Sequence, residues 1–130
     1  MKPEFTWLAG VSLFTAVLWV PYVLDRFVTW GIADTVGYPE NPKPQSAWAQ
    51  RLMKAHHNAV ENLVVFAALV LTASAAGLGG PALAQAAMIY FVARVVHAAA
   101  YTLALPWVRT LGFIGGVYAQ VCVAWMILSK

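Results

Sequence analysis

The chain has 130 residues, of which 62% are hydrophobic and only 10% are charged. Because an ordinary soluble domain has roughly 25% charged residues, this composition argues against a soluble protein and indicates an integral membrane protein. The net charge of +3 comes from basic and acidic residues scattered along the chain, and no basic run suggests nucleic-acid binding. The single cysteine, Cys122, excludes an intramolecular disulfide.

The first of four predicted membrane spans covers residues 5–24, which carry no charge. A span requires about 20 predominantly apolar residues, and this segment has that length. A cleaved signal peptide is the alternative interpretation, but the apolar run is too long and no small-residue cleavage site follows it. Pro21 is expected to kink the last turn of the span.

Residues 25–45 are predicted to form the one substantial loop. They contain two glycines and three prolines, and the NPKP run favours extended backbone over helix. We expect this loop to lie on the headgroup surface, held there by Trp30 and Tyr38. Ser46 is a suitable N-cap for the next helix, which should begin before the membrane and cross it over residues 55–76.

A tight turn at residues 77–81 leads to the third span, residues 82–105, which Pro106 is expected to end. Trp107 and Arg109 then lie in a short connector before the fourth span, residues 111–128. Small residues recur along these spans where helices must approach closely. The predicted fold is therefore an all-α integral membrane protein, a single four-helix domain over residues 1–130.

Loop charges predict the orientation of this bundle. With four spans, both termini lie on one side of the membrane, and that side carries Lys2 and Lys130. The other side carries five basic residues, so the positive-inside rule places the long loop and the start of the second helix in the cytoplasm. The five are Arg26, Lys43, Arg51, Lys54 and Arg109.

The second helix carries a polar face into the membrane. At 3.6 residues per turn, Asn58 and Asn62 fall on one line, with Glu61 close beside it. Burying these groups costs several kcal/mol unless they find partners, so we look for a functional site here. A metal site is disfavoured: His57 and Glu61 offer two ligands one turn apart, a typical catalytic site needs three, and the adjacent His56 points elsewhere.

The third span carries a second polar stripe, because Arg94, His97 and Tyr101 recur at helical spacing. An unpaired arginine at mid-span costs about 2.5–3.5 kcal/mol, so Arg94 should face protein. Glu61, the only acidic residue within any span, is its natural partner. The pair would either fix helix register or serve a site, and His97 is interpreted as a core histidine rather than a catalytic base.

Three sequence stretches carry a family resemblance: KAHHNAVEN from residue 54, RVVHAAAY from residue 94 and PWVRT from residue 106. Together with the chain length and the four spans, they resemble the MAPEG family, the membrane-associated proteins of eicosanoid and glutathione metabolism, in its bacterial type. The resemblance implies a homotrimer in a bacterial inner membrane, with glutathione held as co-substrate between subunits on the cytoplasmic side. It also implies a glutathione-dependent transferase or peroxidase acting on lipophilic electrophiles or lipid hydroperoxides.

The resemblance further implies roles for individual residues. Arg109, at the start of the fourth span, would stabilise the glutathione thiolate and is the candidate catalytic residue. The candidate glutathione-binding residues are Arg26, Lys54, His57, Asn58, Glu61, Arg94, His97 and Tyr101.

Three positions depart from the pattern of active members. Lys54 and His57 stand where arginines are common, and Phe113 replaces a tyrosine hydroxyl in some members. Lysine lacks the bidentate fork of arginine, and histidine is mostly neutral at pH 7. A second function therefore stays open: a non-catalytic trimeric membrane module that binds a lipid headgroup or a partner protein.

Overall fold

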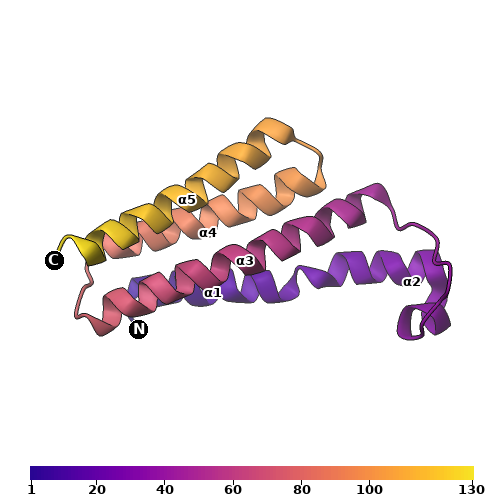
Figure 1. Ribbon diagram of the computed structural model, residues 1–130, viewed down its shortest axis with the longest axis horizontal. Coiled ribbons are helices and arrows are strands. Elements are labelled where there is room, and N and C mark those ends of the chain that lie inside the picture. The colour runs from indigo at the N-terminus through magenta and orange to yellow at the C-terminus, as the bar shows by residue number, and fades with distance from the viewer.

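The computed structural model covers residues 1–130 and consists of helices joined by short connections, with no strand (Figure 1). The helices form four segments that are long and apolar enough to cross a membrane, the first of them made of two consecutive helices. The predicted all-α membrane fold with four spans is confirmed. The helices are α1 (Pro3–Val17), α2 (Trp19–Val36), α3 (Ala47–Ala75), α4 (Pro81–Thr102) and α5 (Pro106–Leu128).

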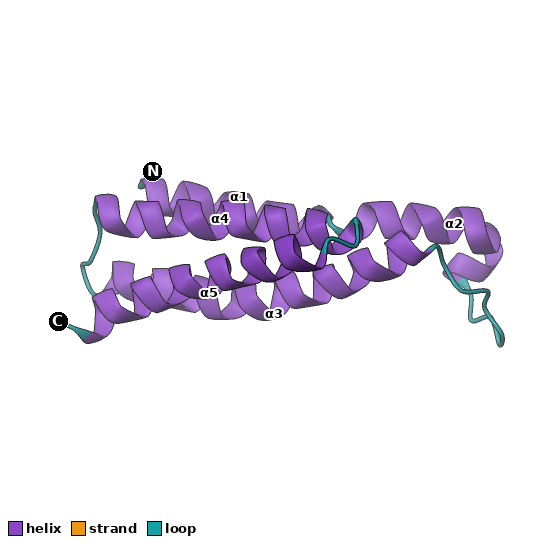
Figure 2. Cartoon of the chain, turned by 90° about the horizontal axis from the view of Figure 1, so that it is seen from above, coloured by secondary structure: helices purple, strands orange, loops and turns teal.

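The four segments run side by side along the long axis of the molecule (Figure 1). Both termini and the α3–α4 turn lie at one end of the bundle, and the α4–α5 turn lies toward the other. Figure 2 shows that α2 and the first turns of α3 extend well beyond the α4–α5 turn. The two ends of the bundle are therefore unlike: one is blunt, and the other carries a helical extension.

The prediction of a loop over residues 25–45 was wrong for its first half, because α2 continues to Val36. Gly31 interrupts the helix with φ 79° and ψ 172°, and the chain resumes helical geometry after it. Thr35 supports this break by donating its hydroxyl to the carbonyl of Gly31 at 2.7 Å. A single glycine therefore bends the helix without ending it, and only the proline-rich residues 37–46 are extended.

Asp25, near the middle of α2, fastens α2 to the start of α3. Its carboxylate accepts hydrogen bonds from the hydroxyl and the N–H of Ser46 and from the side-chain amide of Gln45. Ser46 does occupy the predicted N-cap position of α3, but its hydroxyl bonds Asp25 and makes no capping bond to its own helix. The first turns of α3 are thus held by a residue 21 positions earlier in the chain.

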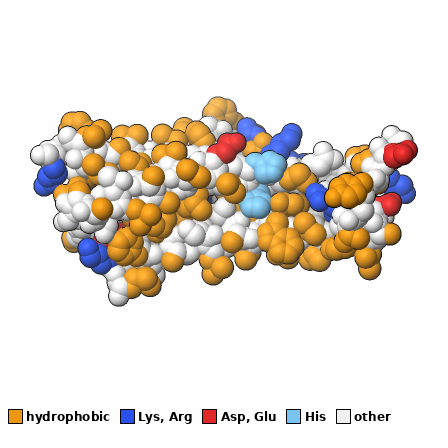
Figure 3. Space-filling view, turned by 60° about the horizontal axis from the view of Figure 1, so that its bottom comes forward, with side chains coloured by type: hydrophobic (Ala, Val, Ile, Leu, Met, Phe, Trp, Pro, Cys, Tyr) orange, Lys and Arg blue, Asp and Glu red, His pale blue; other side chains and the backbone are white.

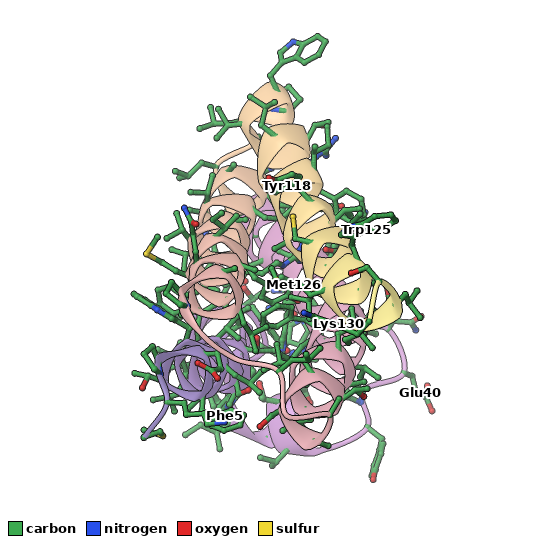
Figure 4. All side chains as sticks on the ribbon, turned by 90° about the vertical axis from the view of Figure 1, so that its left-hand side faces the viewer. Phe5, Glu40, Tyr118, Trp125, Met126 and Lys130 are labelled. Atoms are coloured by element: carbon green, nitrogen blue, oxygen red, sulfur yellow. The ribbon has the colours of Figure 1, made fainter.

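Apolar side chains from α1, α3, α4 and α5 form the core. Phe66 of α3 stacks on Tyr90 of α4 with ring centroids 3.8 Å apart. On α5, Met126 packs against this core, whereas the neighbouring Trp125 is 73% exposed (Figure 4). Exposed large apolar side chains cover the outside of the bundle, as expected for helices that face lipid.

Glycines on α5 allow a close approach to α4. A Cβ on Gly112 would lie 2.9 Å from the backbone nitrogen of His97, and one on Gly116 would lie 3.4 Å from Cδ of Arg94. The prediction that small residues permit close helix packing is therefore confirmed at this contact. The same approach sets Arg94 and His97 directly against α5.

The boundary between the last two helices differs from the predicted one. α4 ends at Thr102, and Pro106 begins α5 instead of ending the preceding span. Proline is favoured at the first helical position because its missing N–H is not needed there. The predicted connector is consequently the first turn of α5, and Arg109 is fixed on a helix.

Two helices in this chain end with the same hydrogen-bond motif but different residues. After α3, the N–H of Leu78 bonds the carbonyl of Ala73, and Gly77 adopts φ 74°. After α4, the N–H of Leu105 bonds the carbonyl of Ala100, and Ala104 adopts φ 58°. Both are Schellman motifs, in which the left-handed position normally carries glycine.

Ala104→Gly is therefore expected to stabilise the protein by about 0.5–1 kcal/mol, because glycine removes the Cβ strain of the left-handed conformation. This gain is partly offset by the greater conformational freedom of glycine in the unfolded chain. A thermal melt in detergent should show a midpoint about 2–4 °C higher. Ala99→Gly, at an exposed position inside α4, is the control and should lower stability by about 1 kcal/mol. A lower midpoint for Ala104→Gly would show that the turn is not strained.

Candidate functional site

Arg94 is the centre of a polar network inside the bundle. It is 2% exposed, and its Nη2 donates to Oδ1 of Asn58 on α3 and lies 3.3 Å from Nδ1 of His97. Its Nε and Nη1 are buried and have no hydrogen-bond partner. Buried donors without partners are rare and unfavourable, so the guanidinium has unused capacity to bind an acceptor.

The expected pair between Arg94 and Glu61 does not form within the chain. Arg94 bonds Asn58, and the side chain of Glu61 is exposed. The two α3 residues differ by three positions, so they point about 60° apart around the helix. Asn58 therefore faces α4, and Glu61 is turned toward the outside of the bundle.

The network continues from α3 to α5 through amide side chains. Asn62 donates to the carbonyl of Asn58 at 2.9 Å, and Gln120 donates to the carbonyl of Asn62 at 3.3 Å. Gln120 was not identified from the sequence. It is the only amide side chain of α5, and a polar residue in an apolar span is a signal that could have found it.

A second group of predicted residues lies at the α4–α5 turn. The guanidinium carbon of Arg109 is 5.0 Å from the ring centroid of Tyr101, so Arg109 stacks on that ring. Both residues line a cavity of about 210 Å³ together with Arg51, whose Nε donates to the carbonyl of Thr102 at 2.9 Å. No acidic side chain lines this cavity, so its two guanidinium groups can bind an anion by donating hydrogen bonds to it.

His97 connects the two groups. Its ring makes an edge contact with Tyr101, with centroids 5.6 Å apart, and lies 6.2 Å from the ring of Phe113. The stripe expected from helical spacing is therefore continuous in the structure. It leads from the buried guanidinium of Arg94 to the arginine cavity at the end of α4.

Three predicted residues on α3 remain on the outside of the single chain. Lys54, His57 and Glu61 are exposed. Figure 3 shows histidine side chains near mid-length on one face of the molecule, with acidic and basic side chains beside them. This face offers charges of both signs next to the buried network.

Arg26 belongs to a different part of the molecule. Its Nε donates to Oε1 of Gln45 at 3.1 Å, and its guanidinium lies over the ring of Trp30. It is therefore held in the α2–α3 junction, and the structure does not bring it to the network around Arg94. His56 is also turned to α2, where its Nδ1 lies 2.8 Å from the hydroxyl of Tyr22.

Comparison with known protein families identifies the family of this chain. The sequence model of the MAPEG family matches residues 8–129, which is nearly the whole chain and includes every residue of the network. Comparison with curated proteins gives no match. The four spans, the polar motifs of α3 and α4 and this match agree, and the chain belongs to the MAPEG family.

Proposed function

We propose that this protein is a membrane-bound glutathione-dependent transferase or peroxidase that acts on lipophilic electrophiles or lipid hydroperoxides. The MAPEG family includes enzymes of this kind. The observation that carries the proposal is the set of guanidinium groups with free donors and no acidic partner: Arg94 in the core and Arg51 and Arg109 at the cavity. Such groups suit a ligand rich in carboxylate and thiolate.

Glutathione presents two carboxylates, one ammonium group and one thiol. Glu61 is the acidic group beside the network and is assigned to the ammonium, since a carboxylate accepts from it readily. Lys54 and His57 on α3 and the free donors of Arg94 are assigned to the carboxylates. Asn58 positions Arg94 and offers its remaining amide donors to the peptide.

The chemistry starts from the glutathione thiolate. A free thiol of this type has a pKa of about 8.5, and a nearby guanidinium favours the ionised form. Arg109 is assigned this role. Its guanidinium lines the cavity and keeps its charge throughout the working pH range, which supports the assignment. His97 and Tyr101 lie between Arg109 and Arg94, since the His97 ring contacts Tyr101 and Arg109 stacks on the Tyr101 ring.

The thiolate sulfur then attacks the second substrate. With an electrophile, a carbon–sulfur bond forms as the leaving group departs with its electron pair or an epoxide ring opens. With a hydroperoxide, sulfur attacks the outer oxygen and breaks the O–O bond, giving an alcohol and glutathione sulfenic acid. A second glutathione reduces the sulfenic acid, which yields the disulfide and water.

The exposed face of α3 supports a further part of the proposal. Lys54, His57 and Glu61 are open on the single chain, so a neighbouring copy would enclose the ligand between subunits of a homotrimer. The excess of basic residues on the side of the α2–α3 junction favours a cytoplasmic location for the site. A lipophilic substrate can then reach the site laterally from the bilayer.

The alternative is a non-catalytic membrane module that uses the same charges to bind a lipid headgroup or partner protein. Phe113 favours it, because this ring lies beside His97 and offers no hydroxyl to a thiol. Lys54 and His57 also make a weaker carboxylate site than two arginines would. Binding and turnover, measured separately, distinguish the two functions.

Isothermal calorimetry with glutathione on detergent-purified protein tests the proposal. Saturable binding is expected, weakened about tenfold or more in Glu61→Gln because a hydrogen bond to a charged group is lost. Glu40→Gln, in the extended segment before α3, is the matched control and should bind normally. Turnover is measured with 1-chloro-2,4-dinitrobenzene and cumene hydroperoxide. Binding without turnover would contradict the enzyme, and absence of glutathione binding would contradict both the enzyme and its assigned site and would favour the module.

A further inference from the structure

A second cavity with charged lining residues lies at the blunt end of the bundle, away from the arginine cavity. It has a volume of about 380 Å³ and is lined by the first residues of α1 and α4. The N-terminus and the α3–α4 turn lie at this end of the bundle (Figure 1). Most of its lining residues are glycine, proline or alanine, and its two charged residues are Lys2 and Glu4. The lining residues are Lys2, Pro3, Glu4, Gly79, Gly80, Pro81 and Ala84.

Glu4 is the unexplained residue of this cavity. It is 2% exposed, and its Oε1 is buried without a hydrogen-bond partner. A Cβ on Gly79 would lie 3.7 Å from that oxygen, so the carboxyl group packs against the α3–α4 turn. Lys130 lies at the same end of the bundle (Figure 4), yet neither it nor Lys2 hydrogen-bonds Oε1. A carboxylate without a partner is unfavourable when buried, and a cationic donor would satisfy it.

The surroundings of Glu4 also favour an anion. Both α1 and α4 begin at this cavity, and neither has a side-chain capping bond. In these first turns, the N–H groups of Phe5 and Thr6 bond the carbonyl of Lys2, and that of Ala84 bonds the carbonyl of Gly80. The N–H groups of Glu4, Ala82 and Leu83 have no acceptor within their helices, and free N–H groups at helix N-termini can bind phosphate. Lys2 adds a full positive charge at the rim. Gly80, at φ 101°, carries the chain into α4 without a side chain that would cover the opening.

A ligand that satisfies both features carries an ammonium group close to a phosphate. We propose that this cavity binds a phosphoethanolamine group, with its ammonium donating to Glu4 and its phosphate at the two helix N-termini and Lys2. A primary ammonium has three N–H donors for the carboxylate, whereas the quaternary ammonium of choline has none. The cavity lies at the ends of the spans, at the depth of lipid headgroups, so phosphatidylethanolamine is the expected source.

Native mass spectrometry of the detergent-purified protein tests this site. The probes are phosphatidylethanolamine, phosphatidylcholine and phosphatidylglycerol with identical acyl chains. The wild-type protein is expected to retain phosphatidylethanolamine about tenfold better than the other two, as for a charge-assisted hydrogen bond. Glu4→Gln should abolish this preference, and the control Glu40→Gln should keep it. Equal retention of the three lipids, or a preference for phosphatidylglycerol, would overturn the proposal.

A second variant keeps the test decisive if Glu4→Gln does not fold. Ala84→Leu places bulk at the cavity wall on the first turn of α4 and leaves every charge in place. It should remove the lipid preference while the protein stays folded, and an undiminished preference would overturn the proposed location. Competition with free O-phosphoethanolamine distinguishes the source: displacement at millimolar concentration identifies the free group as a ligand, and no displacement identifies the membrane lipid.

Discussion

Arg109→Ala is expected to lower turnover of glutathione with an electrophile by a factor of ten or more, while folding and glutathione affinity stay nearly unchanged. Arg109 is placed beside the thiol in the proposed mechanism and takes no part in holding the peptide. Without its charge, the pKa of the bound thiol should return toward about 8.5. The thiolate absorbance at neutral pH should fall, and the pH dependence of kcat should shift to higher pH.

The competing interpretation of Arg109 is a helix-end arginine that reaches lipid phosphate. In that case Arg109→Lys should be silent, and Arg109→Ala should reduce stability slightly without changing turnover. Lys43→Ala, which removes an exposed charge between α2 and α3, is the matched control for general loss of positive charge. Full conjugating activity in Arg109→Ala would remove this residue from the mechanism.

The stacking of Arg109 on Tyr101 makes this test sharper. The ring holds one face of the guanidinium, so its in-plane N–H groups remain free for an anion. Tyr101→Leu should release Arg109 and reduce turnover less than Arg109→Ala does, because the charge remains but its position is no longer fixed. A lipid-anchoring arginine would not respond to loss of the ring in this way.

The helices could be predicted because composition and length determine them in a membrane. An apolar run of about 20 residues has few alternatives to a helix in a bilayer, where every backbone group must be bonded internally. Helical periodicity also placed Arg94, His97 and Tyr101 on one stripe, as the structure shows. These features depend on local sequence alone.

The partners of these residues could not be predicted in the same way. Periodicity fixes the angle between Asn58 and Glu61 but leaves open which of them faces α4. That choice depends on the rotation of α3 about its axis, which is set by packing over the whole bundle. Arg51 was missed as a cavity residue for the same reason, because its contact with Thr102 joins positions 51 residues apart.

The errors at residues 25–36 and 106–110 have a common origin. Both segments contain residues that often end helices, Gly31 in one and Pro106 in the other. In the structure Gly31 bends α2, and Pro106 begins α5. Whether such a residue ends, bends or starts a helix depends on tertiary contacts, among them the bonds from Asp25 to Ser46 that hold α2 against α3.

Asn58→Leu is expected to destabilise the protein by about 3 kcal/mol, because it removes the hydrogen-bond partner of a buried charged group. Arg94 already has two buried nitrogens without partners, so the loss of Asn58 would leave its guanidinium with only the neighbouring His97 ring. Arg94→Met should cost less, since the amide of Asn58 is half-buried and keeps access to other partners. Thermal or denaturant unfolding in detergent, without glutathione, measures both losses.

The double variant Asn58→Leu with Arg94→Met isolates the interaction. It removes the buried charge together with its acceptor. Its loss of stability should therefore be smaller than the sum of the two single losses by about 0.5–3 kcal/mol. Glu61→Gln is the control, because its exposed side chain makes no bond to Arg94 within the chain and its loss should leave stability unchanged. Additive losses for Asn58 and Arg94, or coupling of Arg94 to Glu61 instead, would show that the guanidinium is held by another acceptor. The size of the coupling therefore measures the interaction between Asn58 and Arg94 in the protein without glutathione.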